Sequence, residues 1–158
     1  MNSAVINGLR ALLVLVLVGS VLGQVLVVLM AQANGADDPW FVGLEVPYSI
    51  AGIATIACVQ AAVVAIWALL AMVASGRIYS GRALRWVDAI IWCGAIATGI
   101  VVATAANTWV IVGFHAPGVA LGLVGSLVAG GTFVLLMLVM RGLLVAAIAD
   151  RAELAEVI

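Results

Sequence analysis

Four long apolar runs, separated by short polar connectors, dominate this chain. Each run is long enough to form a helix that crosses a bilayer, which takes about 20 residues. The runs cover residues 11–32, 48–73, 86–112 and 118–140. The pattern therefore predicts an all-α integral membrane protein, a four-helix bundle that forms a single domain over residues 1–158 and ends in a helical tail at 141–158.

The composition supports the membrane class. The chain is 67% hydrophobic and 8% charged, with a mean hydropathy of +1.37, whereas soluble domains are about half apolar and about a quarter charged. The four runs leave no room for a separate aqueous catalytic domain. Direct binding to nucleic acid is also excluded, because the net charge is −1 and lysine is absent, and phosphate backbones need a basic surface.

The basic residues indicate how the spans are oriented. All six are arginines, and in a four-span chain they fall on one side: Arg10, Arg77, Arg82, Arg85, Arg141 and Arg151. The connectors on the other side carry Asp37, Asp38, Glu45 and the single histidine, His115. By the positive-inside rule, both termini are expected in the cytoplasm.

The first run has an alternative interpretation as a cleaved signal peptide, because Ala31-Gln32-Ala33 is an A-x-A sequence. The apolar core of a signal peptide is usually about 7–15 residues long, and this run reaches about twenty, which favours a retained span. Cleavage would leave three spans and an N-terminus outside the cell.

Small residues recur at a spacing of four in every run, which lets helix backbones approach closely in lipid. We expect these stripes to meet in a tight bundle, although a homodimer through Gly19 and Gly23 is an alternative. Cys58 and Cys93 are interpreted as small packing residues at different depths. The stripes are Gly19 and Gly23; Ala54, Cys58 and Ala62; Ala89, Cys93 and Ala97; and Gly118, Gly122, Ser126 and Gly130.

Polar residues inside the runs are few. Gln24 and Gln60 lie at similar depths on adjacent antiparallel helices, so they are expected to be able to hydrogen-bond, either as a structural contact or as part of a ligand site. Together with Asn107 they form a candidate intramembrane polar cluster.

Asp88 is the one acid close to a span, just inside the start of the third run. Arg85 precedes it by one helical turn and is expected to pair with it, and Ser80 is placed to cap the helix. An interfacial ion pair is favoured over a proton or substrate site because the position is shallow.

The connector between the second and third runs is the candidate interaction surface. It contains Arg77, Tyr79, Arg82, Arg85 and Asp88. The C-terminal tail faces the same compartment, so Glu153 or Glu156 is expected near Arg77, Arg82 or Arg85.

Catalytic constellations are missing from the sequence. One histidine cannot build a His-rich metal site, no glycine-rich phosphate loop follows a strand, and no paired carboxylates lie in the spans. We therefore expect no metal, no cofactor and no enzymatic activity.

The segments GRIYSGRALRWVDAI and RAELAEVI resemble a bacterial family of four-span membrane proteins, domain of unknown function 2975. The matching residues are Gly76, Ile78, Tyr79 and Ser80, followed by Arg85, Trp86, Val87 and Asp88. The resemblance covers nearly the whole chain and is of an actinobacterial type. It implies an integral plasma-membrane protein, often associated with a small helix-turn-helix regulator encoded nearby, and it supplies no catalytic residues.

Two functions remain open from the sequence. The first is a non-enzymatic accessory or regulatory protein that acts through protein contacts at the cytoplasmic connector and tail, and that is able to form homo-oligomers. The alternative is a small transporter, or a protein that binds lipid or another small molecule, with a polar cavity around Gln24, Gln60 and Asn107. A polar cavity at those residues would favour the alternative.

Overall fold

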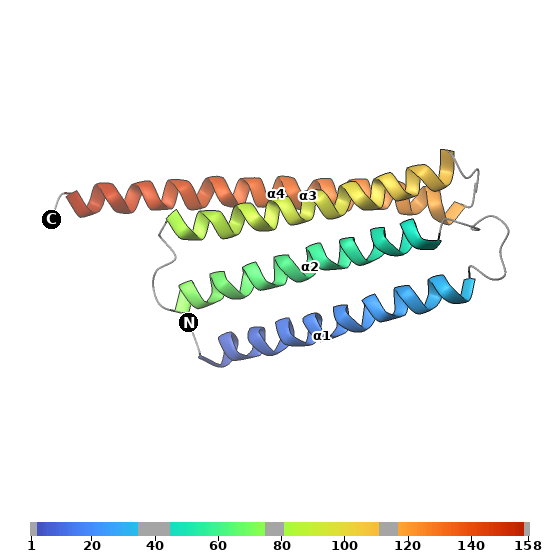
Figure 1. Ribbon diagram of the computed structural model, residues 1–158. Coiled ribbons are helices and arrows are strands. Elements are labelled where there is room, and N and C mark those ends of the chain that lie inside the picture. Colours follow the sequence, from blue (N-terminus) through green and yellow to red (C-terminus); the bar gives the residue numbers. More distant parts are fainter. Residues whose placement is uncertain (1–2, 35–44, 75–80, 111–116, 157–158) are drawn as a thin grey trace.

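A computed structural model describes residues 3–34, 45–74, 81–110 and 117–156, and all of them are helical (Figure 1). Among these residues there is no strand. Two helices carry a proline in their first turn: Pro117 opens the last helix and Pro47 lies in the first turn of the second. Proline is tolerated there because a missing N–H costs little in a first turn. The elements are α1 (Ser3–Asn34), α2 (Glu45–Ala74), α3 (Gly81–Val110) and α4 (Pro117–Glu156).

Each helix contains a segment long and apolar enough to cross a membrane. All four helices extend beyond the apolar runs of the sequence, and α1 starts at Ser3 rather than at residue 11. α3 starts at Gly81 rather than at residue 86, and α4 continues past residue 140 to Glu156. Both extensions are rich in Arg, Ala and Leu, which favour the helix whether lipid or water surrounds them. The four segments are Ile6–Met30, Val46–Ala74, Gly81–Val110 and Pro117–Asp150.

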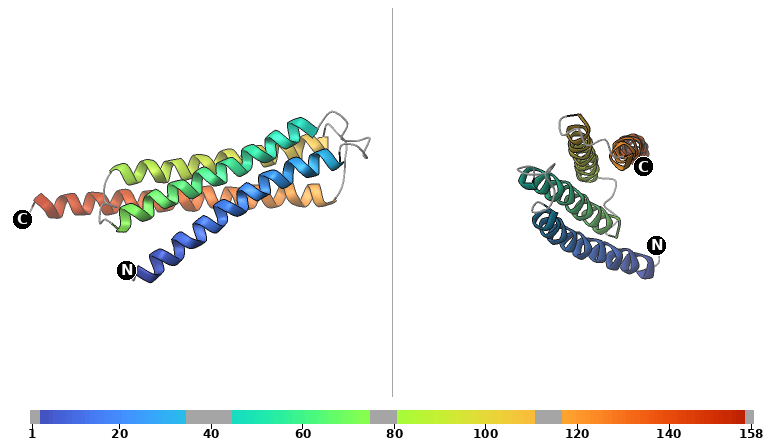
Figure 2. Two further views of the ribbon diagram at one scale, coloured as in Figure 1. Left: turned by 60° about the horizontal axis from the view of Figure 1, so that its bottom comes forward. Right: turned by 90° about the vertical axis from the view of Figure 1, so that its right-hand side faces the viewer.

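The helices form an antiparallel bundle that is open along one side. α1 packs on α2, α2 on α3 and α3 on α4, and no other pair is in contact within the described residues. Viewed along the helices, the four follow one another in a curved row (Figure 2). Each of the two outer helices, α1 and α4, therefore packs on a single neighbour, and most of their described side chains face outward.

The best-packed apolar cluster joins α1 and α2. Leu13, Val63 and Leu70 are buried there, and Ile6, Leu17 and Ile66 pack around them. Elsewhere large apolar side chains are exposed, such as Leu15 on α1 and Leu121 on α4. In a bilayer these side chains contact lipid, which is as apolar as leucine, so their exposure does not oppose folding.

Two glycines allow α3 and α4 to pack closely. A Cβ atom on Gly94 would lie 2.5 Å from Cε1 of Phe133, and a Cβ atom on Gly130 would overlap the side chain of Thr98. Small residues thus work as expected at this crossing. The rest of the α4 stripe does not behave as expected, because Gly118 and Gly122 have no described atom within 4 Å of the position a Cβ would take.

The stripe on α1 is also only partly used. Gly23 faces Ile56 of α2, with 3.8 Å between a built Cβ and Cδ1 of the isoleucine, whereas Gly19 faces open space. Among the glycines of these two helices, Gly52 has the closest contact, because a Cβ there would lie 3.0 Å from Val27. The helices therefore pack closely only at particular crossings, and not along the whole of each stripe as expected. In the open row, the other small residues have no neighbouring helix against them.

Candidate functional site

Four described arginines lie at the end of the bundle where α1 and α3 start, which we call the arginine end. They are Arg10 of α1, Arg82 and Arg85 of α3, and Arg141 of α4. They gather there because the helices alternate in direction, so the start of α1 and α3 and the later part of α4 share one end (Figure 1). The arginine end holds Arg82, Arg85 and Asp88, which are the described members of the candidate interaction surface.

An ion pair joins α3 to α4 at the arginine end. Arg141 donates from Nε to Oδ1 of Asp88 at 2.5 Å and from Nη2 to Oδ2 at 3.5 Å. The two side chains remain 41% and 39% exposed. The planar guanidinium thus contacts both carboxylate oxygens, which fixes direction as well as distance.

This ion pair corrects the expectation that Asp88 pairs with Arg85. Arg85 lies on the same helix as Asp88, but the fork of Arg141 approaches from α4 and occupies both oxygens of the carboxylate. The tertiary structure supplies a partner 53 residues away, which sequence spacing within α3 does not reveal. The one feature of the sequence that hints at this pairing is the basic residue at position 141, just after the last apolar run.

Arg82 and Arg85 are exposed and line a hollow of about 350 Å³ together with Trp86 and Ala89. Since Asp88 is engaged by Arg141, neither arginine has an acidic partner within the described residues. The remaining predicted members of the interaction surface, Arg77 and Tyr79, lie outside the described residues. The same holds for the capping residue Ser80 and for the expected contacts of Glu153 and Glu156.

The structure brings Gln24 and Gln60 together, as the sequence predicts. Each Nε2 donates to the other residue's Oε1 at 3.3 Å, so the two amides form a reciprocal pair between α1 and α2. Gln60 also donates to Ser20 at 3.1 Å, and Ser20 donates to the carbonyl of Leu17. The contribution of Ser20 was missed, although its position one turn before Gln24 placed it on the same face.

Asn107 does not belong to this cluster, which corrects the expected group of three. Its Oδ1 accepts a hydrogen bond from the Tyr48 hydroxyl at 3.0 Å, and that hydroxyl also lies 2.8 Å from Oγ1 of Thr108. Tyr48 and Gln60 are both on α2, separated by twelve residues, which is about 18 Å along the helix. The two polar groups therefore lie at different depths and form two separate contacts.

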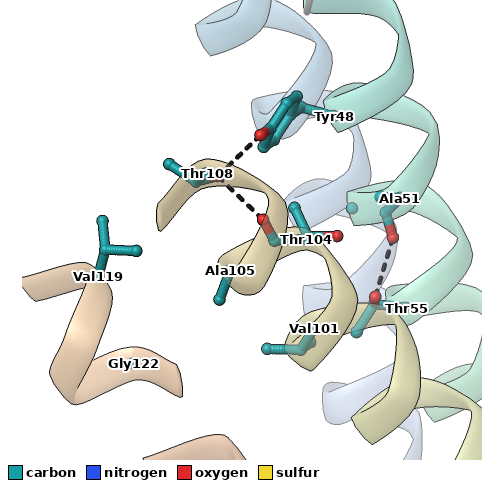
Figure 3. Close-up of a pocket in the computed structure, with 10 residues that line it drawn as sticks. Tyr48, Ala51, Thr55, Val101, Thr104, Ala105, Thr108, Val119 and Gly122 are labelled. Atoms are coloured by element: carbon teal, nitrogen blue, oxygen red, sulfur yellow. Dashed lines mark hydrogen bonds between the residues drawn. The ribbon is translucent and has the colours of Figure 1, made fainter. Parts of the chain in front are cut away.

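A groove runs along α3 between α2 and α4, and it contains two hollows. The one nearer Tyr48 measures about 420 Å³ (Figure 3). The hydroxyl groups of its three threonines bond to backbone carbonyls of their own helices, so its wall is mainly apolar: Thr55 donates to Ala51, Thr104 to Ile100 and Thr108 to Thr104.

The second hollow lies deeper along the groove and measures about 550 Å³. Cys58 of α2 and Cys93 of α3 both line it, so the expectation that they lie at different depths was wrong. Both are free thiols and are half-buried. Within the described residues no three His, Cys, Asp or Glu side chains are arranged to hold a metal ion.

Four long apolar helices in alternating directions define a multi-pass membrane protein. The chain matches the family described as Protein of unknown function (DUF2975) over residues 29–158, and it belongs to that family. The match confirms the resemblance found at the connector and the tail. It leaves out most of α1. No curated protein and no solved structure matches the chain.

Proposed function

We propose that this protein is a non-enzymatic accessory or regulatory protein of the plasma membrane, and that it acts by binding another protein at the arginine end. The observation that carries the proposal is the projection of α4 beyond its neighbours (Figure 1). α4 continues for fifteen residues after Arg141, whereas seven residues separate Asp88 from the start of α3. The excess is about eight residues, or about 12 Å.

The later part of α4 has the surface that a protein partner needs. Leu143, 62% exposed, and Val145, 42% exposed, lie beside the first turns of α3, and the exposed residues Ala149 and Asp150 begin the projecting part. None of the other described helices reaches past the level where α3 begins, so the last turns of α4 are accessible from several sides. Exposed apolar side chains on a helix with a polar end are a common recognition surface for another protein.

The partner that we propose is a small cytoplasmic regulator with a helix-turn-helix domain, because the sequence resembles a family whose members are often associated with one that is encoded nearby. Such a regulator would carry the contact with DNA, and this chain would bind no nucleic acid directly. The predicted orientation favours the same partner, because cytoplasmic termini put the projecting part of α4 where a soluble protein reaches it.

Site-specific photo-crosslinking in cells tests the proposal. A photoreactive amino acid at the exposed position of Ala149, where the projecting part begins, should give an adduct with a second, soluble protein. Leu135 on the membrane face of α4, 65% exposed, and Leu121 near its start, 73% exposed, are matched controls. They should give at most adducts with another copy of this chain. The same adducts from all three positions, or no protein adduct from Ala149, would contradict the proposal.

One observation favours a second candidate function, the binding of an apolar molecule. The hollow of about 550 Å³ is lined by small and apolar residues of three helices, including Ala62, Ala97 and Gly130. Ala97→Phe would fill it, whereas Ala103→Phe would add the same ring at an exposed position of α3. Loss of a co-purified lipid, detected by native mass spectrometry, in the first variant alone would support binding. Retention in both would reject it.

A further inference from the structure

The hollow of about 350 Å³ at the start of α3 has the properties of an anion site. Two arginines, Arg82 and Arg85, share it with Trp86 and Ala89. Both guanidinium groups are exposed, and the described part of the chain offers them no carboxylate, because Arg141 engages Asp88 through both oxygens. Two uncompensated positive charges beside one hollow attract a ligand that carries negative charge.

The depth of the hollow indicates which anions it meets. From Trp86 to the end of α3 at Val110 there are 24 residues, which is about 36 Å of helix. The hydrocarbon core of a bilayer is about 30 Å thick, and about 40–45 Å with its headgroups. Trp86 therefore lies at the membrane interface, where tryptophan is enriched. Arg82 and Arg85, up to one turn further out, lie at the level of the lipid phosphates.

We propose that Arg82, Arg85 and Trp86 bind the headgroup phosphate of an anionic phospholipid. The guanidinium groups present paired N–H donors that match phosphate oxygens. The indole of Trp86 and the small side chain of Ala89 form the apolar side of the site, next to the glycerol and the first carbons of the acyl chains. Free phosphate shares the charge chemistry but makes no use of this apolar side, so the lipid is the ligand assigned.

This site goes beyond the proposed function, which rests on the side chains of α4. The two use different residues and different measurements. A lipid bound at Arg82 and Arg85 would anchor the start of α3 to the leaflet that is richer in anionic lipid, and the surface potential of that leaflet attracts basic residues.

Native mass spectrometry of the full chain in detergent micelles tests the site. Phosphatidylglycerol, phosphatidylcholine and inorganic phosphate are titrated separately. Near an anionic surface each arginine contributes about a fivefold change in binding constant. Arg85→Gln should therefore weaken phosphatidylglycerol binding about fivefold, and Arg82→Gln with Arg85→Gln about twenty-five-fold. Arg10→Gln makes the same charge change at the same end of the bundle but on α1, outside the hollow, so it is the control and should weaken binding less than Arg85→Gln does.

Three results would overturn the site: unchanged phosphatidylglycerol binding in the double variant, an equal loss in Arg10→Gln, or displacement of the lipid by inorganic phosphate. The last result would make free phosphate the ligand. If the double variant does not insert into the membrane, Arg85→Lys replaces it as the test, because lysine keeps the charge but lacks the paired N–H donors of a guanidinium. Its binding should fall between the unsubstituted chain and Arg85→Gln, and binding equal to the unsubstituted chain would overturn the phosphate geometry.

Discussion

Arg141 of α4 contacts both carboxylate oxygens of Asp88 on α3, with its Nε 2.5 Å from Oδ1. This contact sets two properties of the arginine end. It fixes the position of α4 along α3, and therefore how far α4 projects past the start of α3. It also removes the nearest acid from Arg82 and Arg85, so their charges are available to other ligands.

The Asp88–Arg141 pair is expected to hold the later part of α4 against α3. Asp88→Asn removes the charge while keeping the shape of the side chain, so amide hydrogen exchange over residues 141–150 should become faster. Exchanging the two residues, Asp88→Arg with Arg141→Asp, should restore most of the protection. Arg85→Gln should leave this exchange unchanged, and an effect as large as that of Asp88→Asn would show that Arg85 shares the carboxylate.

The amide pair between α1 and α2 is expected to be structural. Gln60→Leu removes the side chain that Gln24 bonds across the helices and should lower the free energy of unfolding by about 1 to 2 kcal/mol. Replacing both glutamines by leucine removes donor and acceptor together and should be nearly neutral. Unfolding in mixed micelles measures both variants. A double variant less stable than the single one would indicate that the pair has a role beyond joining the helices.

Two consecutive glycines of α4 provide a matched test of the α3–α4 crossing. A methyl group at Gly130 would overlap Thr98, whereas one at Gly131 would have no described atom within 4 Å. Gly130→Ala should therefore lower the free energy of unfolding by about 1 to 3 kcal/mol through overpacking. Gly131→Ala should raise it by up to about 1 kcal/mol through helix propensity. Equal changes in the free energy of unfolding for the two variants, measured in an unfolding titration, would show that α3 and α4 do not cross at Gly130.

The orientation of the chain is a prediction from its arginines. A reporter that is active only in the cytoplasm should work when fused after Ile158 or before Met1. A reporter that is active only outside should work when inserted at Asp38, in the acidic connector. The opposite pattern would mean that the arginine end faces outward, which would also remove the basis for a cytoplasmic partner.

Much of the fold followed from the sequence because few structures suit a bilayer. Backbone groups in hydrocarbon must bond within their own helix, so long apolar runs specify helices whatever surrounds them. The antiparallel order follows from short connectors. The pairing of Gln24 with Gln60 was also predictable, since equal depth on neighbouring helices brings the two amides to one level.

The sequence by itself determined the class of protein, its four helices and the gathering of arginines at one end, because hydropathy and charge act through local position along the chain. Only the tertiary structure decided which side chains meet across helices. It paired Asp88 with Arg141 rather than Arg85, and it placed Asn107 beside Tyr48 rather than with the two glutamines. It also arranged the helices as an open row. These choices depend on the rotation and crossing of each helix against its neighbour, which a pattern of small and apolar residues on many faces leaves undetermined.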